Sequence, residues 1–381
     1  MSVVFIGHFS DGLGPLNAAS SIAGNQVQRQ IFREISERVE DEKATCFSME
    51  PVPAWPKGPI LVWSKSEERV RFIGFLNLPV LKHIVFAIRL FFQLQKHPPD
   101  LCVQYNAYLW ENLTLLCTRA LNAGMRISLI VQDVHVNPGL GFFSKRGIRS
   151  RMERIAMRLA RNFDLVIAVT PDILKDFQLN PLRCIVFPGG VTEFAGKLAR
   201  TSADKLEDFA VFAGALEAHN GIEQLIERWE SLQRQVPLHV FGKGQLASLV
   251  SAAAQRCANI HFHGFQPEHV IYEWHCRARW NVCLRYSEGL DQRYFFPSKF
   301  FNVVCAPGVV LVNDFHALPQ SLRKFLVVLD DGLTGLEGAL LATRDGPVAM
   351  ELASRREIVR SEYDWSAAVS QLFCAIPPQN G

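Results

Sequence analysis

The sequence predicts an α/β protein with two doubly wound domains that face each other across a ligand cleft. One observation behind this prediction is that short apolar strands alternate with helical patterns along the whole chain. Another is that 381 residues, 49% of them hydrophobic, are enough to bury two cores. A polar stretch near residues 191–209 separates the halves. We therefore expect one domain over residues 1–195 and a second over 205–360, with a closing helix within 365–381 that packs back onto the first.

The expected strands are continuous apolar runs, which parallel sheets bury on both faces. In the first domain they cover residues 3–7, 60–63, 101–106, 126–133, 164–170 and 183–190. In the second domain they cover residues 209–215, 237–244, 259–265, 279–286, 308–314 and 325–330. An apolar segment over residues 79–97 contains Lys82 and Arg89 and is short for a membrane span, so it favours a core helix.

Composition narrows the class of protein. The formal net charge of +3 gives no reason to expect a polyanion that binds the whole chain, so any basic patch must be local. The nine cysteines form no CxxC pair, which favours reduced thiols over a disulfide framework or a zinc ribbon. The start of the chain lacks the features of a signal peptide. We expect a cytoplasmic protein, either soluble or peripheral on the inner face of the cell membrane.

Glycines follow three successive strands of the second domain. They are Gly214 in FAGALEAHNG, Gly242 in FGKGQ and Gly264 in HGF. A glycine after a strand lets a ligand approach the backbone closely. A single one is more often a turn residue, but three along one sheet edge favour a ligand crevice.

The stretch YFFPSKFFNVVCAPG places Ser298 and Lys299 at the start of a short apolar helix. Free backbone N–H groups and one cation at a helix start suit an anionic ligand. A surface lysine after a turn is the alternative.

These segments, together with NIHFHGFQPEHVIYEWHCRARWNVCLRYSEG, resemble the donor domain of GT-B glycosyltransferases, with the family-4-like group (glycosyl transferases group 1) as the best match. In the first half, QDVHVNPG and DLVIAVTPDILKDF fit the same family. The resemblance implies two Rossmann-like domains and a hexosyltransferase-type enzyme. It also implies a nucleotide-diphosphate sugar as donor, a hydroxyl acceptor, and neither a metal nor another cofactor.

The resemblance also implies roles for particular residues. Ser298 would donate to the diphosphate, Lys299 would neutralise it, and Asn302 would face the ribose in place of a glutamate that is usual there. Glu288 in YSEGLD would stand for the other family glutamate. Arginine and lysine are missing from GALEAHNG, so other bases such as Arg293 would have to supply that charge. The remaining donor-side residues that the resemblance implies are Gly214, Asn220, Gly242, Lys243, Phe265 and Arg285.

Candidates for acid–base chemistry follow strands of the first domain. They are His8 after the first strand, and Asp133 and His135 in QDVH. A histidine or aspartate at this edge can remove the proton of an acceptor hydroxyl. A capping or structural role is the alternative for each. The HFH motif (His261 and His263) has no carboxylate at a ligand spacing, so we expect no metal there.

The strongest local charge is SKRGIRSRMERIAMRLARNF, residues 144–163. As a helix it carries Arg151, Arg154, Arg158 and Arg161 on one stripe and apolar residues on another. A solvated helix face is one interpretation. The other is a surface for anionic lipid headgroups or a lipid-diphosphate acceptor. No aromatic residues alternate with these bases, so nucleic acid is not expected.

The sequence thus predicts transfer of a sugar to a hydroxyl acceptor, a lipid-linked saccharide in polysaccharide or glycoconjugate biosynthesis. Retention of configuration is favoured by the family resemblance. One alternative is an inverting transferase with Asp133 or His8 as base. Another is a non-catalytic nucleotide-binding homologue, suggested by Asn302 and the loop without arginine.

Overall fold

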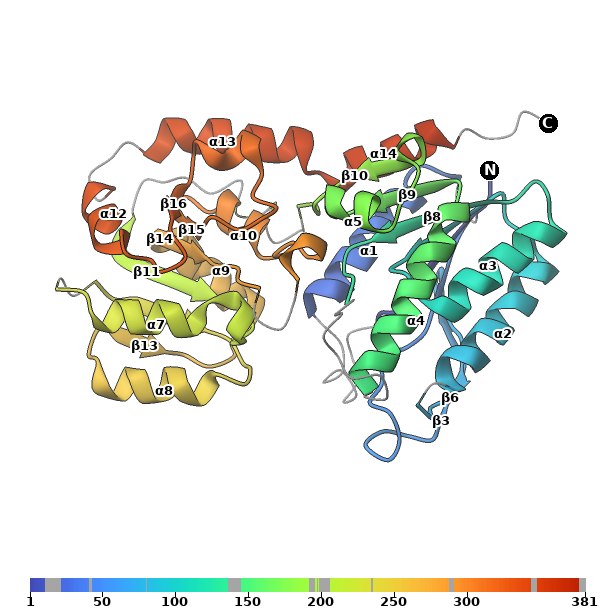
Figure 1. Ribbon diagram of the computed structural model, residues 1–381, viewed down its shortest axis with the longest axis horizontal. Coiled ribbons are helices and arrows are strands. Elements are labelled where there is room, and N and C mark those ends of the chain that lie inside the picture. The colour runs from blue at the N-terminus through green and yellow to red at the C-terminus, as the bar shows by residue number, and fades with distance from the viewer. Residues whose placement is uncertain are drawn as a thin grey trace. The chain divides into compact units, whose positions relative to one another are not determined.

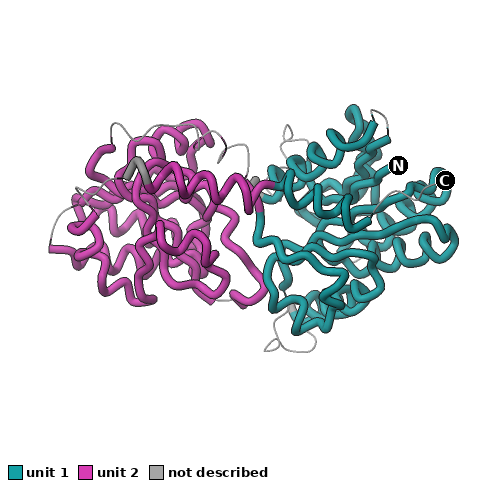
Figure 2. The backbone as a smooth tube through the Cα atoms, turned by 90° about the horizontal axis from the view of Figure 1, so that it is seen from above, with its two compact units in different colours: residues 1–189, 365–381 teal, residues 190–364 magenta. Residues whose placement is uncertain are grey.

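The computed structural model describes residues 1–10, 22–40, 43–79, 81–135, 145–191, 196, 198, 206–233, 236–287, 291–343 and 348–376. The chain divides into two compact units (Figure 2). Unit 1 comprises residues 1–189 and 365–381, and unit 2 comprises residues 190–364. Each unit is a parallel sheet with helices packed on it, which confirms the predicted α/β class.

In the described part of unit 1, eight strands form a sheet in the order β10-β9-β8-β7-β1-β2-β5-β4, and β4 pairs antiparallel at the edge (Figure 1). The strands are β1 (Val3–Gly7), β2 (Ala44–Ser48), β4 (Lys65–Glu67), β5 (Val70–Phe72), β7 (Leu101–Tyr105), β8 (Arg126–Val131), β9 (Leu165–Ala168) and β10 (Cys184–Val186). The helices are α1 (Ile22–Ser36), α2 (Leu81–Lys96), α3 (Leu109–Leu121), α4 (Lys145–Leu159), α5 (Pro171–Asp176) and α14 (Trp365–Ala375). The strand expected at residues 60–63 is shorter, β3 (Leu61–Val62), and pairs antiparallel with β6 (Phe75–Leu76) outside this sheet.

The strand order of unit 1 places a switch point between β1 and β7. From β1 the chain moves to β2 on one side, and it later returns through β7 on the other side. The crossover connections therefore leave in opposite directions, which opens a crevice at the carboxyl ends of these two strands. Any ligand of unit 1 is expected there.

Helix α14 completes the core of unit 1. Its Trp365 is fully buried, and the Trp365 ring lies 4.8 Å from the Phe187 ring, centroid to centroid. Val3 and Phe5, at alternate positions of β1, join α14 and α1 in one buried cluster. Arg38, just after α1, donates hydrogen bonds to the Ser366 carbonyl and hydroxyl oxygens. Helix α3 packs between α2 and α4 in a separate layer.

In the described part of unit 2, six parallel strands form a sheet in the order β13-β12-β11-β14-β15-β16. The strands are β11 (Glu207–Ala213), β12 (Leu238–Phe241), β13 (Ile260–Phe262), β14 (Ala278–Cys283), β15 (Val309–Asn313) and β16 (Val327–Leu329). The helices are α7 (Ile222–Glu230), α8 (Ala247–Arg256), α9 (Glu268–Arg277), α10 (Phe300–Cys305), α11 (Gln320–Arg323), α12 (Leu336–Ala342) and α13 (Val348–Glu362). Here the switch point lies between β11 and β14.

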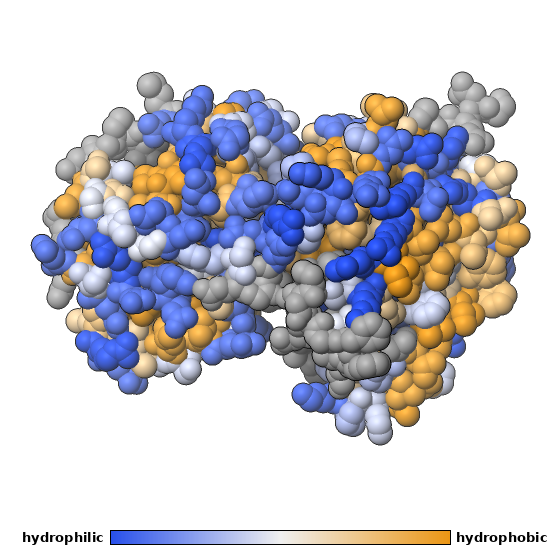
Figure 3. All heavy atoms as spheres, viewed as in Figure 1, coloured by the Kyte–Doolittle hydropathy of each residue, from blue (hydrophilic) through white to orange (hydrophobic). Residues whose placement is uncertain are grey.

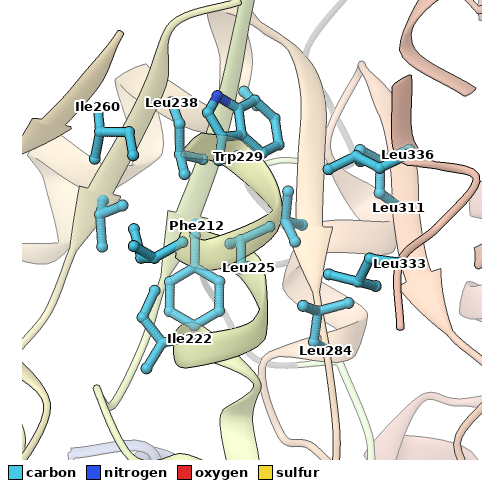
Figure 4. Packing of buried hydrophobic residues seen from close by; sticks show 14 of the residues in the cluster. Phe212, Ile222, Leu225, Trp229, Leu238, Ile260, Leu284, Leu311, Leu333 and Leu336 are labelled. Carbon is cyan, nitrogen blue, oxygen red and sulfur yellow. The ribbon is translucent and has the colours of Figure 1, made fainter. Parts of the chain in front are cut away.

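The main core of unit 2 joins the sheet to α7, α8 and α12. Phe212 of β11 belongs to the same buried cluster as Leu225 and Trp229 of α7 and Leu336 of α12 (Figure 4). A smaller cluster on the other side of the sheet contains Phe209 and packs against α9. The sheet is therefore covered on both faces, as continuous apolar strands require.

Among the described helices, none combines the length and the apolar character needed to cross a bilayer. The segment over residues 79–97 forms α2, which has 16 residues and buries Phe86, Leu90 and Leu94.

Candidate functional sites at the two switch points

The switch point of unit 2 is occupied by the side chain of Lys299. Gly214 follows β11, and Arg285 follows β14. A Cβ atom placed on Gly214 would lie 3.3 Å from Lys299 Cδ and 3.4 Å from Lys299 Nζ. The lysine therefore lies against the bare backbone at the end of β11, and any side chain at Gly214 would crowd it.

The ammonium group of Lys299 is enclosed, and none of the described residues provides a counter-ion for it. Its Nζ lies 3.9 Å from the centroid of the Phe212 ring. The residue as a whole is partly exposed, but Nζ itself is buried and has no hydrogen-bond partner among the described residues. Burial, with a smaller effect of the Arg285 charge, lowers the pKa of Lys299 to about 8. A buried cation of this kind is unfavourable unless an anion joins it.

His219 adds no further positive charge beside Lys299 and Arg285 at pH 7. It lies in a short 3-10 helix, Ala218–Asn220, in the loop after β11. Burial, together with the charges of Arg285 and Lys299, lowers the pKa of His219 to about 4, so its imidazole is neutral at pH 7. His219 is not among the residues predicted from the sequence, because the family resemblance concerns the missing lysine in GALEAHNG.

Backbone packing explains the glycine that follows β12. A Cβ atom on Gly242 would lie 1.9 Å from the Gly214 carbonyl oxygen. The Gly242 N–H donates to the Gly264 carbonyl oxygen at 2.8 Å, and the Asn220 side chain donates to the Ala215 carbonyl oxygen at 2.9 Å. The loops after β11, β12 and β13 thus pack backbone against backbone, and Asn220 braces the first of them.

Two further donor-side residues form an exposed pair. Lys243 Nζ lies 4.7 Å from the centroid of the Phe265 ring, and Phe265 is 52% exposed. An aromatic face beside a cation offers a stacking surface for a planar ligand. Both residues follow strands of the sheet edge that carries Lys299.

The remaining donor-side predictions lie around α10 or outside the described residues. Ser298 is exposed, and Asn302 is half-buried in α10. Because α10 has six residues, its dipole is small, and Lys299 supplies most of the positive charge. Arg293 cannot supply free charge, since it forms an ion pair with Asp291 at 2.7 Å. Glu288 lies outside the described residues.

The switch point of unit 1 holds a buried carboxylate between two histidines. His8 follows β1, Glu111 lies in the first turn of α3, and His83 lies in the first turn of α2. Glu111 Oε1 is 3.3 Å from His8 Nε2 and 3.4 Å from His83 Nδ1, and the Glu111 side chain is fully buried. Tyr108 stacks on His8 with ring centroids 4.0 Å apart and planes 2° apart, which fixes the orientation of His8.

The charges of this cluster follow from burial and contact. Burial alone would raise the pKa of Glu111, but the close contacts with His8 and His83 lower it to about 2. Burial lowers the pKa of His8, which outweighs the opposing effect of Glu111. At pH 7 the cluster is therefore a carboxylate with a neutral His8 beside it.

Asp133 and His135 follow β8, next to β7 in the sheet, so they reach the same edge as His8. The Asp133 N–H donates to Asn106 Oδ1 at 3.3 Å. The His135 N–H donates to Glu153 Oε1 at 2.9 Å, and the His135 ring lies 3.5 Å from the same oxygen. His135 is therefore tied to α4, whereas His8 is tied to Glu111.

Helix α4 forms as the sequence predicts, but its apolar stripe is partly exposed. Ile148 and Ile155 are each 45% exposed. Arg158 is exposed and Arg151 and Arg154 are half-buried, whereas Arg161 donates a hydrogen bond to the Phe177 carbonyl oxygen. Figure 3 shows a hydrophilic row along α4 and hydrophobic residues gathered beside it over α2 and α3. Among the large hydrophobic residues of these two helices, Ile88 and Phe92 of α2 and Leu121 of α3 are 53%, 65% and 66% exposed.

Comparison with known proteins defines the fold. No protein-family model matches the sequence, and no curated protein is significantly similar to it. Solved structures of GT-B glycosyltransferases, by contrast, match over nearly the whole chain. Two parallel α/β units, together with these matches, show that the chain has the GT-B glycosyltransferase fold.

Three of the similar structures illustrate the match. HepE from Anabaena, in complex with UDP, has 13% sequence identity and a TM-score of 0.64, with 98% of this chain and 100% of HepE covered. WaaG, a glycosyltransferase involved in lipopolysaccharide biosynthesis, has 14% identity and a TM-score of 0.64, with both chains fully covered. A UDP-forming trehalose-phosphate synthase from Burkholderia xenovorans, in complex with glucose-6-phosphate, has 13% identity, a TM-score of 0.66 and coverage of 99% and 100%.

Proposed function

We propose that the protein transfers a sugar from a nucleotide-diphosphate donor to a hydroxyl acceptor. The observation that carries this proposal is the enclosed ammonium group of Lys299, which has no counter-ion within the described part of the chain and lies against Gly214 at the switch point of unit 2. A diphosphate there would supply the missing negative charge. As the donor bond breaks, charge develops on the leaving diphosphate, and a cation already in place stabilises it.

The exposed aromatic ring of Phe265 supports a nucleotide rather than inorganic phosphate. Its ring is 52% exposed and lies at the end of β13, on the same sheet edge as Lys299. If the nucleotide base stacked on Phe265, its phosphates could extend along the sheet edge toward Lys299. Asn302, one helical turn after Lys299, would then face the ribose, as the family resemblance implies.

We assign the acceptor to a lipid-linked saccharide at a membrane surface. The support is the α4 face of unit 1, where Arg154 and Arg158 lie beside exposed Ile148 and Ile155. Basic residues attract anionic headgroups, and apolar side chains between them enter the interface. WaaG, which shares the fold, is a glycosyltransferase involved in lipopolysaccharide biosynthesis.

A binding experiment with a matched variant tests the donor assignment. We expect UDP or GDP to bind in isothermal titration calorimetry, and Lys299→Ala to weaken that binding by about 1–3 kcal/mol, or about 5- to 150-fold. Lys324→Ala is the control, because Lys324 also lies over an aromatic ring, Phe325, but at the end of α11. No binding of any nucleotide, or equal losses in the two variants, would contradict the proposal.

For the stereochemical course we favour retention, which follows from the family-4 resemblance. A second candidate is inversion with His8 as the base. It is favoured by one contact, the fully buried Glu111 3.3 Å from His8 Nε2, because a carboxylate can orient a histidine base. The anomeric configuration of the product, read by NMR, separates the two. Nucleotide binding without turnover on any sugar donor would instead favour a non-catalytic homologue.

A further inference from the structure

Three potential ligand atoms converge at the switch point of unit 1. They are His8 Nε2, His83 Nδ1 and Glu111 Oε1, and all lie within 4.8 Å of one another. The two distances to Glu111 Oε1 are 3.3 Å and 3.4 Å. A tetrahedral ion with bonds of about 2.0–2.1 Å holds its ligand atoms about 3.3 Å apart. Two of the three spacings therefore match those that such an ion requires, and the distance between the two histidine nitrogens is within 4.8 Å.

We propose that unit 1 binds a divalent transition-metal ion of the zinc type through His8, His83 and Glu111. Two imidazoles and one carboxylate are a ligand set that zinc uses in catalytic sites. The proposal goes beyond the transfer reaction and does not rest on it. It also departs from the expectation, drawn from the family resemblance, that the protein holds no metal.

Unsatisfied buried atoms are the second observation that points to a ligand. Among the described residues, buried His8 Nε2 and Glu111 Oε2 have no hydrogen-bond partner. Native proteins rarely leave buried polar side-chain atoms unpaired, so each such atom needs an explanation. A metal ion would bind His8 Nε2 directly and would place a positive charge beside the buried Glu111 carboxylate.

The surroundings fit an open site rather than a closed structural one. Within the described residues, no fourth histidine, cysteine or carboxylate joins the three. Three protein ligands leave the fourth position for water or a substrate oxygen. The His83 side chain is 25% exposed, which gives an entry path, while the Tyr108 ring stacked on His8 holds the imidazole in place. A bound ion would occupy His8 Nε2, so this nitrogen could not then act as a base.

Metal titration tests the proposal. After treatment with a chelator, the full chain is titrated with Zn²⁺ in a calorimeter, and we expect one equivalent to bind. His83→Gln should weaken binding about 10-fold or more, while nucleotide affinity stays unchanged. The control is His261→Gln, because His261 stacks with His239 in a separate histidine group of unit 2. Absence of Zn²⁺ binding, or equal effects of the two variants, would overturn the assignment.

The absorption spectrum of bound Co²⁺ gives a second test. It reports directly on the ligands of the ion, and it would not appear if the three residues served only to stabilise the fold. In this site Co²⁺ should show the visible absorption of a four-coordinate ion, without the near-ultraviolet charge-transfer band of thiolate ligands. A thiolate band would instead mean binding at cysteines such as exposed Cys117 or Cys374, and it would overturn the proposal. Glu111→Gln should remove the cobalt spectrum. If Glu111→Gln does not fold, His83→Gln still tests the metal site. The His83 side chain is 25% exposed, so its replacement should disturb the fold less.

Discussion

At Lys299 the folded protein encloses an ammonium group over the ring of Phe212, and no carboxylate of the described residues pairs with it. The same residue that would bind a diphosphate therefore weakens the ligand-free fold. Such a conflict between stability and function is expected at a binding site, since the ligand supplies what the apoprotein lacks. It predicts opposite effects of one substitution on two measurements.

Replacing Lys299 by methionine should stabilise the ligand-free protein while nucleotide affinity falls. An unfolded lysine titrates near its ordinary pKa of 10.5, whereas the pKa of Lys299 is about 8. Between these values the unfolded state binds more protons, so the stability of the native sequence rises with pH there. The advantage of Lys299→Met, about 1–3 kcal/mol, should be complete below pH 8 and disappear between pH 8 and 10.5.

Thermal unfolding between pH 7 and pH 10 measures this difference. Lys324→Met is the control, because Lys324 is exposed and its removal should leave the melting temperature nearly unchanged at every pH. A Lys299→Met protein that melts below the native one at pH 7 would contradict the enclosed, unpaired state of the lysine.

Residues of the two sites differ in how far the sequence reveals them. Lys299 and Gly214 stand in short segments where a glycine ends a strand or a lysine begins a helix, so local sequence is enough to select them. His83 and Glu111 lie inside the apolar patterns of α2 and α3, and they meet His8 only through tertiary packing. The feature that distinguishes Glu111 is its complete burial near the start of a helix. Burial cannot be read from a single sequence, so there was no usable sequence signal for this residue.

Secondary-structure elements show the same division. Continuous apolar runs such as those of β1 and β7 were predicted, because a strand buried on both faces needs no alternation. Strand β2, with the sequence ATCFS, was missed, since its small and polar residues give no apolar run. The short edge strands β4 and β5 were missed as well, because their exposed side chains give the antiparallel pair little pattern.

For helix α4 we expect measurable binding to anionic vesicles. A basic residue near an anionic surface contributes about 1 kcal/mol. The double variant Arg154→Gln/Arg158→Gln should therefore weaken binding to phosphatidylserine-containing vesicles by about 2 kcal/mol, or about 30-fold. Co-sedimentation at low ionic strength measures this, and added salt should reduce the binding.

An arginine variant elsewhere in unit 1 is the control for vesicle binding. Arg33 of α1 is exposed and already paired with Glu37, so Arg33→Gln should leave vesicle binding unchanged. Equal sedimentation of the native protein with neutral and anionic vesicles would contradict a basic membrane surface on α4. The protein would then need a water-soluble acceptor.

On the scale of the whole molecule, each unit has its own hydrophobic core and its own switch-point site. Phe5 and Trp365 belong to the core of unit 1, and Phe212 and Trp229 to the main core of unit 2. A ligand that binds only the native form of one unit stabilises that unit by mass action. The two ligand classes proposed here should therefore act on different parts of the unfolding curve.

Differential scanning calorimetry tests this separation. We expect UDP or GDP, whichever binds, to raise the unfolding temperature of one component and Zn²⁺ to raise that of another. His83→Gln should remove the zinc effect alone, and Lys299→Ala the nucleotide effect alone. A single transition that responds equally to both ligands in both variants would show that the units unfold together and would contradict independent cores.

The return of the chain to unit 1 at α14 has a consequence for biosynthesis. Trp365 fills the core beside Phe187, so the sheet of unit 1 lacks part of its interior until α14 is made. Translation of the intervening residues 190–364 takes about 10–35 s at about 5–20 residues per second. During that delay the nascent sheet exposes the apolar surface that α14 later covers, while the inserted segment already has all it needs to fold. Ribosome-associated chaperones are therefore expected to bind the first half of the nascent polypeptide and to release it only after the final helix emerges.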